Sequence, residues 1–186
     1  MKLLIMGPPG VGKGTQADRI KTELGIVHLS TGDILREEVK AKTKIGMDAK
    51  LYMDFGKLVP DQILIEIVKE HISKPICQNG YLLDGFPRTL PQAEGLDEMM
   101  LSIGHNLDCV ISLMVDEDEL VDRLIKRGKE SGRSDDTPEI IRNRQKIYWE
   151  LTAPLLDFYR GKSLLKEVNG LGEISEITER ILAVLT

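Results

Sequence analysis

The segment MGPPGVGKGTQ, residues 6–16, follows the first hydrophobic run of the chain and contains four glycines, two prolines and one lysine. Glycine has no Cβ, so the backbone can turn sharply there and bring its N–H groups close to a ligand. A strand, such a loop and a helix in this order aim several N–H dipoles at one point, where an anion is stabilised. Lys13 adds a full positive charge. The segment therefore predicts a phosphate-binding loop between a strand and a helix.

The spacing Gly7-x4-Gly12-Lys13 matches the known phosphate-binding pattern, which calls for serine or threonine directly after the lysine. This chain has Gly14 there and Thr15 one residue later, so the role of the Thr15 hydroxyl at a metal stays open. An ordinary Gly/Pro turn is the alternative interpretation. The ordered succession of strand, loop, lysine, hydroxyl and helix favours phosphate binding.

The composition fits one domain, because 186 residues suffice to bury a substantial core. A net charge of −5 and an aromatic content of 4% argue against binding of nucleic acid. The hydrophobic run at residues 3–6 is too short for a signal peptide or a membrane span, so we expect a cytoplasmic protein. Cys77 and Cys109 lie far apart in sequence, so we expect buried or free thiols rather than a disulfide or a zinc site.

Short hydrophobic runs alternate with helical patterns, which predicts an α/β fold with a parallel sheet covered by helices on both faces. The expected strands are residues 3–6, 26–29, 80–83, 108–115 and 164–168. The chain between the second and third strands has helical patterns at residues 33–42, 47–55 and 61–72. This is more chain than one crossover needs, so we expect a helical insertion.

A second interruption, residues 128–136, is polar and rich in glycine, and it predicts a mobile flap. Gly128 is placed to end the preceding helix, and Thr137 with Pro138 to begin the next one. Closure of such a flap over bound substrates would exclude water from the reaction.

Several arginines occupy helix positions where a solvated charge is unexpected. At about 100° per residue, Arg144 falls within the apolar stripe of its helix, whereas Arg142 falls on the opposite side. The stripe consists of Ile140, Ile147, Tyr148, Leu151 and Leu155. Burying an unpaired charge is costly, so Arg144 is expected beside an anion. Arg123 and Arg127 share one flank of the preceding helix, either as a solvated pair or directed at the same anion as Arg133 of the flap.

The segment YLLDGFPRTLPQAE, residues 81–94, ends a strand at Asp84 and starts a helix near Thr89. Ligands bind at the carboxyl ends of strands in open α/β sheets, so Asp84 and Arg88 are placed for a polyanion and its metal. Gln92 faces inward, where its amide either reads a base edge or is a tolerated buried polar group. At a third strand-to-helix junction, Ser30 or Thr31 is the expected cap, and Asp33 is a candidate for a capping role. Arg36, on the same helix, is either solvated or directed at a ligand.

These motifs together resemble the nucleoside monophosphate kinases, and among them the AMP-phosphorylating branch with a short lid. The resemblance covers almost the whole chain, with several separated motifs in the right order. It implies a three-layer P-loop fold of residues 1–186 with a five-stranded parallel sheet, a monophosphate-binding insertion at 30–59 and a lid at 128–138. It also implies the reaction Mg·ATP + AMP ⇌ 2 ADP, carried out by a monomer in nucleotide homeostasis.

The resemblance also assigns roles to residues. ATP would be held by Gly10, Val11, Gly12, Lys13, Gly14, Thr15, Arg123 and Arg127. AMP would be held by Thr31, Arg36, Lys57, Val59, Gly85, Arg88, Gln92, Arg133 and Arg144. Lys13, Arg88, Arg127, Arg133 and Arg144 would surround the transferring group, and Asp84 would orient the water shell of Mg²⁺ without a direct bond.

The UMP/CMP branch of the family is the nearest alternative, but it usually reads Ser-Ala-Gly where this chain has Ser30-Thr31-Gly32. A P-loop module that binds nucleotide without transferring phosphate is the other alternative; the inward arginines would be superfluous in it. The flap contains no cysteine, so we expect no structural zinc. We expect none of the three histidines to act as a base, because an AMP phosphate with a second pKa of about 6 attacks without losing a proton near neutrality.

Overall fold

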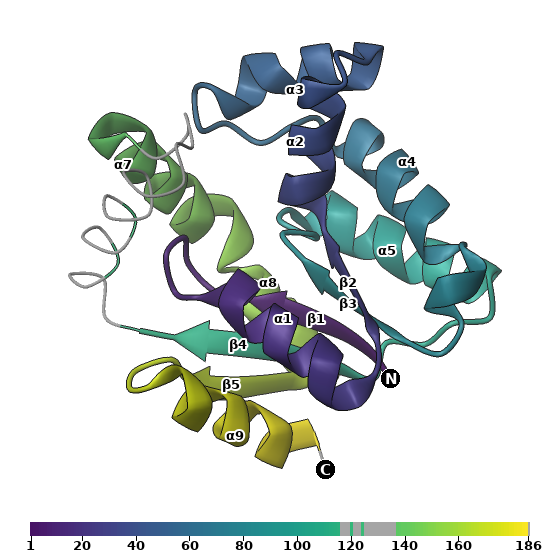
Figure 1. The fold of residues 1–186 in the computed structure, drawn as a ribbon, viewed down its shortest axis with the longest axis vertical. Helices are drawn as coiled ribbons and strands as arrows, with labels where there is room; N and C mark the ends of the chain where they lie inside the picture. The colour runs from purple at the N-terminus through teal and green to yellow at the C-terminus, as the bar shows by residue number, and fades with distance from the viewer. Residues whose placement is uncertain (116–119, 121–123, 125–136, 186) are drawn as a thin grey trace.

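The computed structural model describes residues 1–115, 120, 124 and 137–185. The elements in chain order are β1 (Lys2–Met6), α1 (Lys13–Leu24), β2 (Val27–Ser30), α2 (Thr31–Lys40), α3 (Lys44–Met53), α4 (Asp61–Ile72), η1 (Pro75–Cys77), β3 (Tyr81–Asp84), α5 (Leu90–Ser102), β4 (Cys109–Met114), α7 (Pro138–Ile147), η2 (Tyr148–Thr152), α8 (Leu155–Gly161), β5 (Leu165–Asn169) and α9 (Ile174–Leu185). The strands form one parallel sheet in the order β2-β3-β1-β4-β5 (Figure 1). The predicted α/β fold with five parallel strands is confirmed.

The strands lie within one residue of the predicted positions. β2, β3 and β5 each begin and end one residue later than expected, so Asp84 and Asn169 complete β3 and β5. Asp108 lies just before β4: its amide donates to the Lys2 carbonyl at 2.9 Å, and its side chain, in place of a backbone carbonyl, accepts from the Lys2 amide at 2.7 Å. Hydrophobic runs locate a strand, but its ends are set by individual hydrogen bonds.

Two hydrophobic cores lie on opposite faces of the sheet, and β1 contributes to both. Leu3 and Ile5 belong to the core under α1 and α9, whereas Leu4 and Met6 belong to the core shared with α4, α5 and α8. Alternation along the strand sends successive side chains to opposite faces, so a fully apolar strand fits a sheet that helices cover on both sides.

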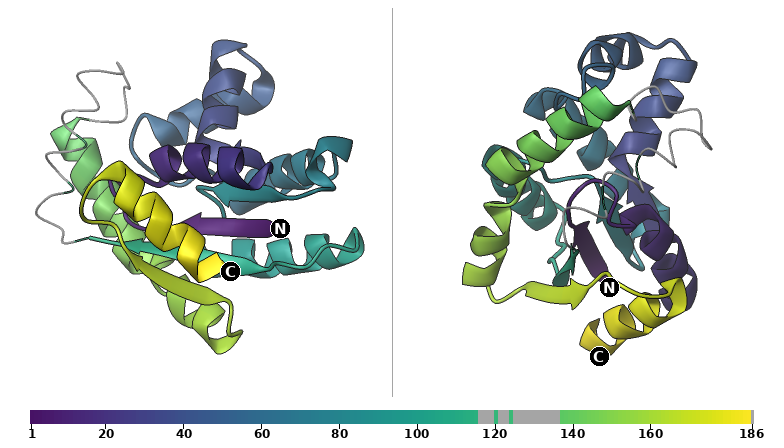
Figure 2. Two further views of the ribbon diagram at one scale, coloured as in Figure 1. Left: turned by 60° about the horizontal axis from the view of Figure 1, so that its bottom comes forward. Right: turned by 90° about the vertical axis from the view of Figure 1, so that its left-hand side faces the viewer.

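The helices α2 and α3 stand away from the sheet in all three views (Figures 1 and 2). They pack closely on each other at Gly46, where a Cβ would lie 2.2 Å from the Glu38 carbonyl carbon. Both helices are capped by hydroxyl groups: Ser30 accepts from the Asp33 amide, and Thr43 from the Gly46 amide. The predicted helical insertion between β2 and β3 therefore exists as helices.

The end of the insertion contacts α7, which comes more than eighty residues later in the chain. Asn143 Nδ2 donates to the Phe55 carbonyl at 2.8 Å. At Gly56, a Cβ would lie 2.8 Å from Ile140 Cγ2 and 3.0 Å from Arg144 Cγ. The absence of a side chain at Gly56 thus allows this close approach. The expected cap of α7 is also present, since Thr137 Oγ1 accepts from the Ile140 amide and Pro138 occupies the first turn.

Of the apolar stripe predicted for this helix, Tyr148 and Leu155 are buried as expected, but the prediction was wrong at Leu151. Leu151 was expected on the apolar face but is exposed, because residues Tyr148–Thr152 form a π-helix that changes the angular spacing of the side chains.

The predicted lid at 128–138 and the helix that precedes it lie outside the described residues, apart from 120, 124, 137 and 138. Among the helices of the described part, none is long and apolar enough to cross a bilayer.

We predict that Gly56→Ala destabilises the protein more than Gly25→Ala does. Both glycines have φ of +63°, so alanine at either position incurs the left-handed backbone penalty of roughly 1–2 kcal/mol. A Cβ at Gly25 meets nothing within 4 Å, whereas one at Gly56 overlaps α7 and adds about 1–3 kcal/mol. Urea unfolding of both variants measures the difference, and equal losses would contradict the close contact.

We also predict that Tyr159→Phe stabilises the protein by about 1 kcal/mol, because a buried hydroxyl without a partner is costly. The Tyr159 hydroxyl is buried and has no hydrogen-bond partner among the described residues. Tyr81→Phe is the matched control, since the equally buried Tyr81 hydroxyl lies 3.4 Å from His105 Nδ1. Chemical denaturation should show a gain for the first variant only.

Candidate active site

A cavity of about 650 Å³ opens at the carboxyl ends of the strands, next to the loop between β1 and α1. A smaller cavity of about 70 Å³ lies beside it toward α2 and α4. The first is lined by the predicted residues Gly10, Val11, Gly12, Lys13, Gly14, Thr15, Asp84, Gly85, Arg36, Arg88 and Arg144. The second is lined by Thr31, Lys57 and Val59 together with Arg36, Gly85, Arg88 and Arg144. Four predicted residues thus face both cavities.

The loop between β1 and α1 uses glycine for backbone conformation at two central positions. Gly10 and Gly12 have φ of +90° and +97°, which other residues rarely adopt. Gly14 is different, because it lies in the first turn of α1 and a Cβ there would only touch Asp84 Oδ2 at 3.8 Å. Gly12 caps α1 and has no side chain that could bind the first amides of the helix, an arrangement typical of anion sites at helix N-termini.

Lys13 is held over this loop by the loop itself. Its Nζ donates to the carbonyl oxygens of Gly7 at 2.6 Å and Pro8 at 3.0 Å. The charged end of the lysine therefore lies at the cavity wall, where the sequence pattern predicted a phosphate ligand.

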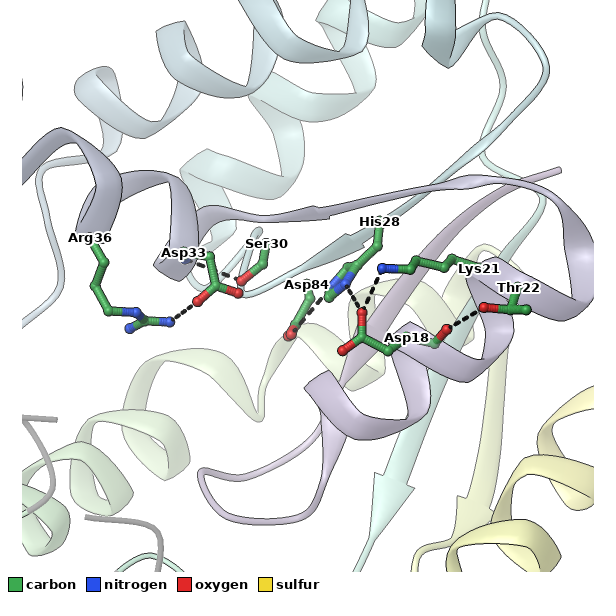
Figure 3. A network of polar contacts seen from close by, with 8 residues as sticks. All are labelled: Asp18, Lys21, Thr22, His28, Ser30, Asp33, Arg36 and Asp84. Carbon is green, nitrogen blue, oxygen red and sulfur yellow. Dashed lines mark hydrogen bonds and ion pairs between the residues drawn. The ribbon is translucent and has the colours of Figure 1, made fainter. Parts of the chain in front are cut away.

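His28 lines the large cavity, and its ring lies between the side chains of Asp18 and Asp84 (Figure 3). Its side chain is only 10% exposed, with Nδ1 3.3 Å from Asp18 Oδ1 and Nε2 3.7 Å from Asp84 Oδ2. Burial alone lowers the pKa of His28, but the carboxylates of Asp84 and Asp18 outweigh it and raise that pKa above its ordinary value. The alternation of side chains along β2 was the available signal, because it puts His28 on the same face as Ser30.

At the start of α2, Ser30 is the cap, and the Asp33 side chain pairs with Arg36 instead of capping the helix (Figure 3). The distance between Arg36 Nη2 and Asp33 Oδ1 is 2.5 Å. Arg36 lines both cavities and is therefore directed at a potential ligand as well as at Asp33.

Gly85 brings Thr31 and Arg88 together at the junction of the two cavities. With φ of +83°, a Cβ at this position would lie 2.8 Å from Thr31 Oγ1 and 3.0 Å from Arg88 Nη2. Arg88 is held by its own turn, because its Nε donates to the Gly85 carbonyl at 2.7 Å. The guanidinium group is thus fixed where the cavities meet.

Gln92 is fully buried and lines neither cavity. Its Oε1 accepts from the Arg88 amide at 2.7 Å, and its Nε2 donates to Asp61 Oδ1 at 2.7 Å. The inward direction predicted for this side chain is confirmed. Its amide is bound to protein groups, so it would reach a base only if the contact with Asp61 changed.

Arg144 lies half-buried on α7 and lines both cavities, whereas Arg142 is exposed, in agreement with the helix wheel. Arg123, Arg127 and Arg133 lie outside the described residues.

Cys77 and Cys109 are both buried and free, as expected, and burial raises the pKa of each thiol.

The described residues contain no group of three or more His, Cys, Asp or Glu side chains that could hold a metal directly. Asp84, whose side chain is 13% exposed, presents one carboxylate to the cavity beside the start of α1. A single carboxylate close to the glycine-rich loop suits Mg²⁺, which keeps most of its water ligands and can be held through them. The residues present therefore fit a magnesium ion that arrives with a nucleotide.

Comparison with known proteins agrees with this geometry. The family model described as "Adenylate kinase" matches residues 5–164. A protein named "Adenylate kinase" from Nocardioides sp. is 49% identical over 185 residues, covering 100% of this chain and 97% of its own. A protein of the same name from Leptospira biflexa is 50% identical over 181 residues, covering 97% of both chains. With its glycine-rich loop between β1 and α1, its cavity arginines and matches over nearly its whole length, the chain belongs to the adenylate kinase family.

Proposed function

We propose that the two adjoining cavities hold ATP and AMP at the same time and that the terminal phosphoryl group of ATP passes directly to the AMP phosphate. Membership of the family makes the chain a phosphotransferase. The observation that carries the proposal is that Lys13, Arg36, Arg88 and Arg144 come from four separate segments and face the same cavity. Two polyanions placed side by side need such a concentration of positive charge.

In this proposal the donor phosphates bind to the loop of residues 10–15. Backbone amides at the start of α1 and the Lys13 ammonium supply the positive charge. Arg123 and Arg127 are also proposed to bind ATP. This part of the proposal rests on the family resemblance alone, because both residues lie outside the described residues.

AMP is proposed to bind on the side of the smaller cavity. Arg36 and Arg88 would hold its phosphate, while Thr31, Gly85 and the chain at Lys57 and Val59 would surround the nucleoside. The same assignment includes Gln92 as a ligand of the base, Arg144 near the transferring group, and Arg133, which is outside the described residues.

The reaction needs no protein base. The second pKa of a phosphate monoester is about 6, so an AMP oxygen is already anionic near neutrality. What the protein supplies is alignment of the two phosphates and stabilisation of charge on the oxygens of the moving group. Arginines suit both tasks, because the planar guanidinium binds two phosphate oxygens at once.

Asp84 would hold Mg²⁺ through the water ligands of the ion. When bound with ATP, the ion neutralises charge on the terminal phosphates. We further propose a monomeric cytoplasmic enzyme whose partners are ATP, AMP and ADP, with no nucleic acid or membrane partner and no structural zinc. In it, residues 30–59 bind the monophosphate and residues 128–138 act as a lid, an assignment that rests on the family resemblance.

We predict that Arg88→Ala and Arg144→Ala each lower kcat for ADP formation by about a thousandfold or more, the usual contribution of an arginine to phosphoryl transfer. Arg142→Ala is the matched control, since it removes an exposed arginine from the same helix as Arg144. A coupled assay with Mg·ATP and AMP measures all three variants. Turnover of Arg88→Ala or Arg144→Ala within about threefold of the parent would contradict the proposal.

The acceptor is tested with the parent protein by offering AMP, CMP, UMP and GMP in turn. We expect rapid ADP formation with AMP only, because Thr31 occupies the position that the UMP/CMP branch fills with alanine. Faster turnover with UMP or CMP would favour that branch. Slow ATP hydrolysis without acceptor dependence would favour a binding module.

We predict a pH effect on stability from His28, measured without nucleotide. Because the pKa of folded His28 is raised, its contribution is present below the unfolded value of about 6.5 and is lost as pH rises through the folded value. The difference in unfolding free energy between the parent and His28→Gln should therefore be larger at pH 5.5 than at pH 8.

His105 supplies a control of opposite sign. Its burial lowers the pKa of its side chain, so its contribution weakens as pH falls through about 6.5. The difference between the parent and His105→Gln should shrink between pH 8 and pH 5.5. The same pH trend in both variants would show that the neighbours of His28 do not determine its effect.

A further inference from the structure

Between α7 and α8, the helical hydrogen-bond pattern changes over five residues. The Ala153 amide donates to the Tyr148 carbonyl, five residues earlier, at 2.8 Å. Pro154 explains the change, because proline has no amide hydrogen and its ring would clash with the carbonyl of Glu150 in a regular α-helix. A wider turn before Pro154 relieves this conflict. Single π-turns of this kind are frequent at functional sites.

Because of the wider turn, Thr152 faces the interior of the protein and its neighbour Leu151 faces solvent. Leu151 is 48% exposed, although regular helix spacing would put it on the apolar face. Thr152 is 7% exposed and lines the large cavity instead. A polar side chain has therefore been turned inward at the expense of an apolar one, which costs stability unless the hydroxyl has a partner.

The partner of the Thr152 hydroxyl is the main chain of Arg88. Thr152 Oγ1 donates to the Arg88 carbonyl oxygen at 2.9 Å, across 64 positions of sequence. On the other side of the same residue, the Arg88 amide donates to Gln92 Oε1 at 2.7 Å. The backbone of Arg88 is thus held from both sides, by α5 and by η2.

We propose that Thr152 is a positioning residue for phosphoryl transfer, and that the π-turn serves to bring its hydroxyl to Arg88. The hydroxyl fixes the Arg88 backbone and, through it, the distance of the guanidinium from the transferring group. This inference rests on the proposed function, because it requires Arg88 to act on the substrates. Errors of about 1 Å in such a group cost up to a hundredfold in rate.

The test compares Thr152→Val, which keeps the shape but removes the donor, with Thr152→Ser, which keeps the donor. Leu151→Ala is the control for an exposed neighbour in the same turn. We expect kcat to fall about ten- to a hundredfold in the valine variant and to stay within about threefold in the serine variant. The leucine variant should match the parent. Measured Tm values should fall by only about 2–4 °C in the valine variant.

A valine variant with lower Tm but with kcat and both KM values within twofold of the parent would overturn the inference, because it would show a purely structural role. A serine variant as slow as the valine variant would also overturn it. If the valine variant does not fold, Thr152→Ala replaces it, since alanine removes the donor without needing more space.

Arg88→Ala, measured in parallel, separates this inference from the proposed function. An active Arg88→Ala would refute the role of Arg88 itself. An inactive Arg88→Ala combined with an active Thr152→Val would refute the positioning role of Thr152 alone.

Discussion

The structure depends on one electrostatic constraint: negatively charged phosphates can lie side by side only where fixed positive groups surround them. A parallel sheet meets this constraint at one edge, because the carboxyl ends of its strands and the starts of the following helices converge there. Gly12 begins α1 at that edge, Ser30 begins α2, and Arg88 lies in the turn after β3. Segments far apart in sequence therefore contribute to one cavity.

Two arginines of this cavity, Arg36 and Arg88, are held by protein groups. Arg36 pairs with Asp33, and Arg88 Nε is bound to the Gly85 carbonyl. Such contacts limit side-chain motion and offset part of the cost of bringing cations together. His28 takes part in the same arrangement on the acidic side, because it lies between the carboxylates of Asp18 and Asp84 (Figure 3).

Much of this architecture could be predicted from local sequence patterns. Hydrophobic runs located the strands, glycine spacing located the loop that lines the large cavity, and helix geometry located Arg144 on the inner face of α7. These features depend on neighbouring residues in the chain, so a single sequence contains them.

Two features that could not be predicted depend on contacts between distant segments. The neighbours of His28 come from α1 and β3, and the Gln92 amide is bound by Asp61 of another helix. Leu151 was placed wrongly because regular helix spacing was extended through Pro154 to Leu155, although a proline within a helical pattern signals a change of geometry. Pro154 was a local sequence signal for the altered turn, whereas no local sequence signal indicated which residues contact His28 and Gln92.

The way in which Lys13 is held has a consequence for the energetics of recognition. When a ligand immobilises a lysine side chain, the loss of rotamer freedom ordinarily costs about 1.5–2 kcal/mol. In this protein the carbonyl groups of Gly7 and Pro8 already restrict its ammonium group. A phosphate that binds there as proposed would meet a preorganised charge, and a larger share of the electrostatic attraction would be expressed as affinity.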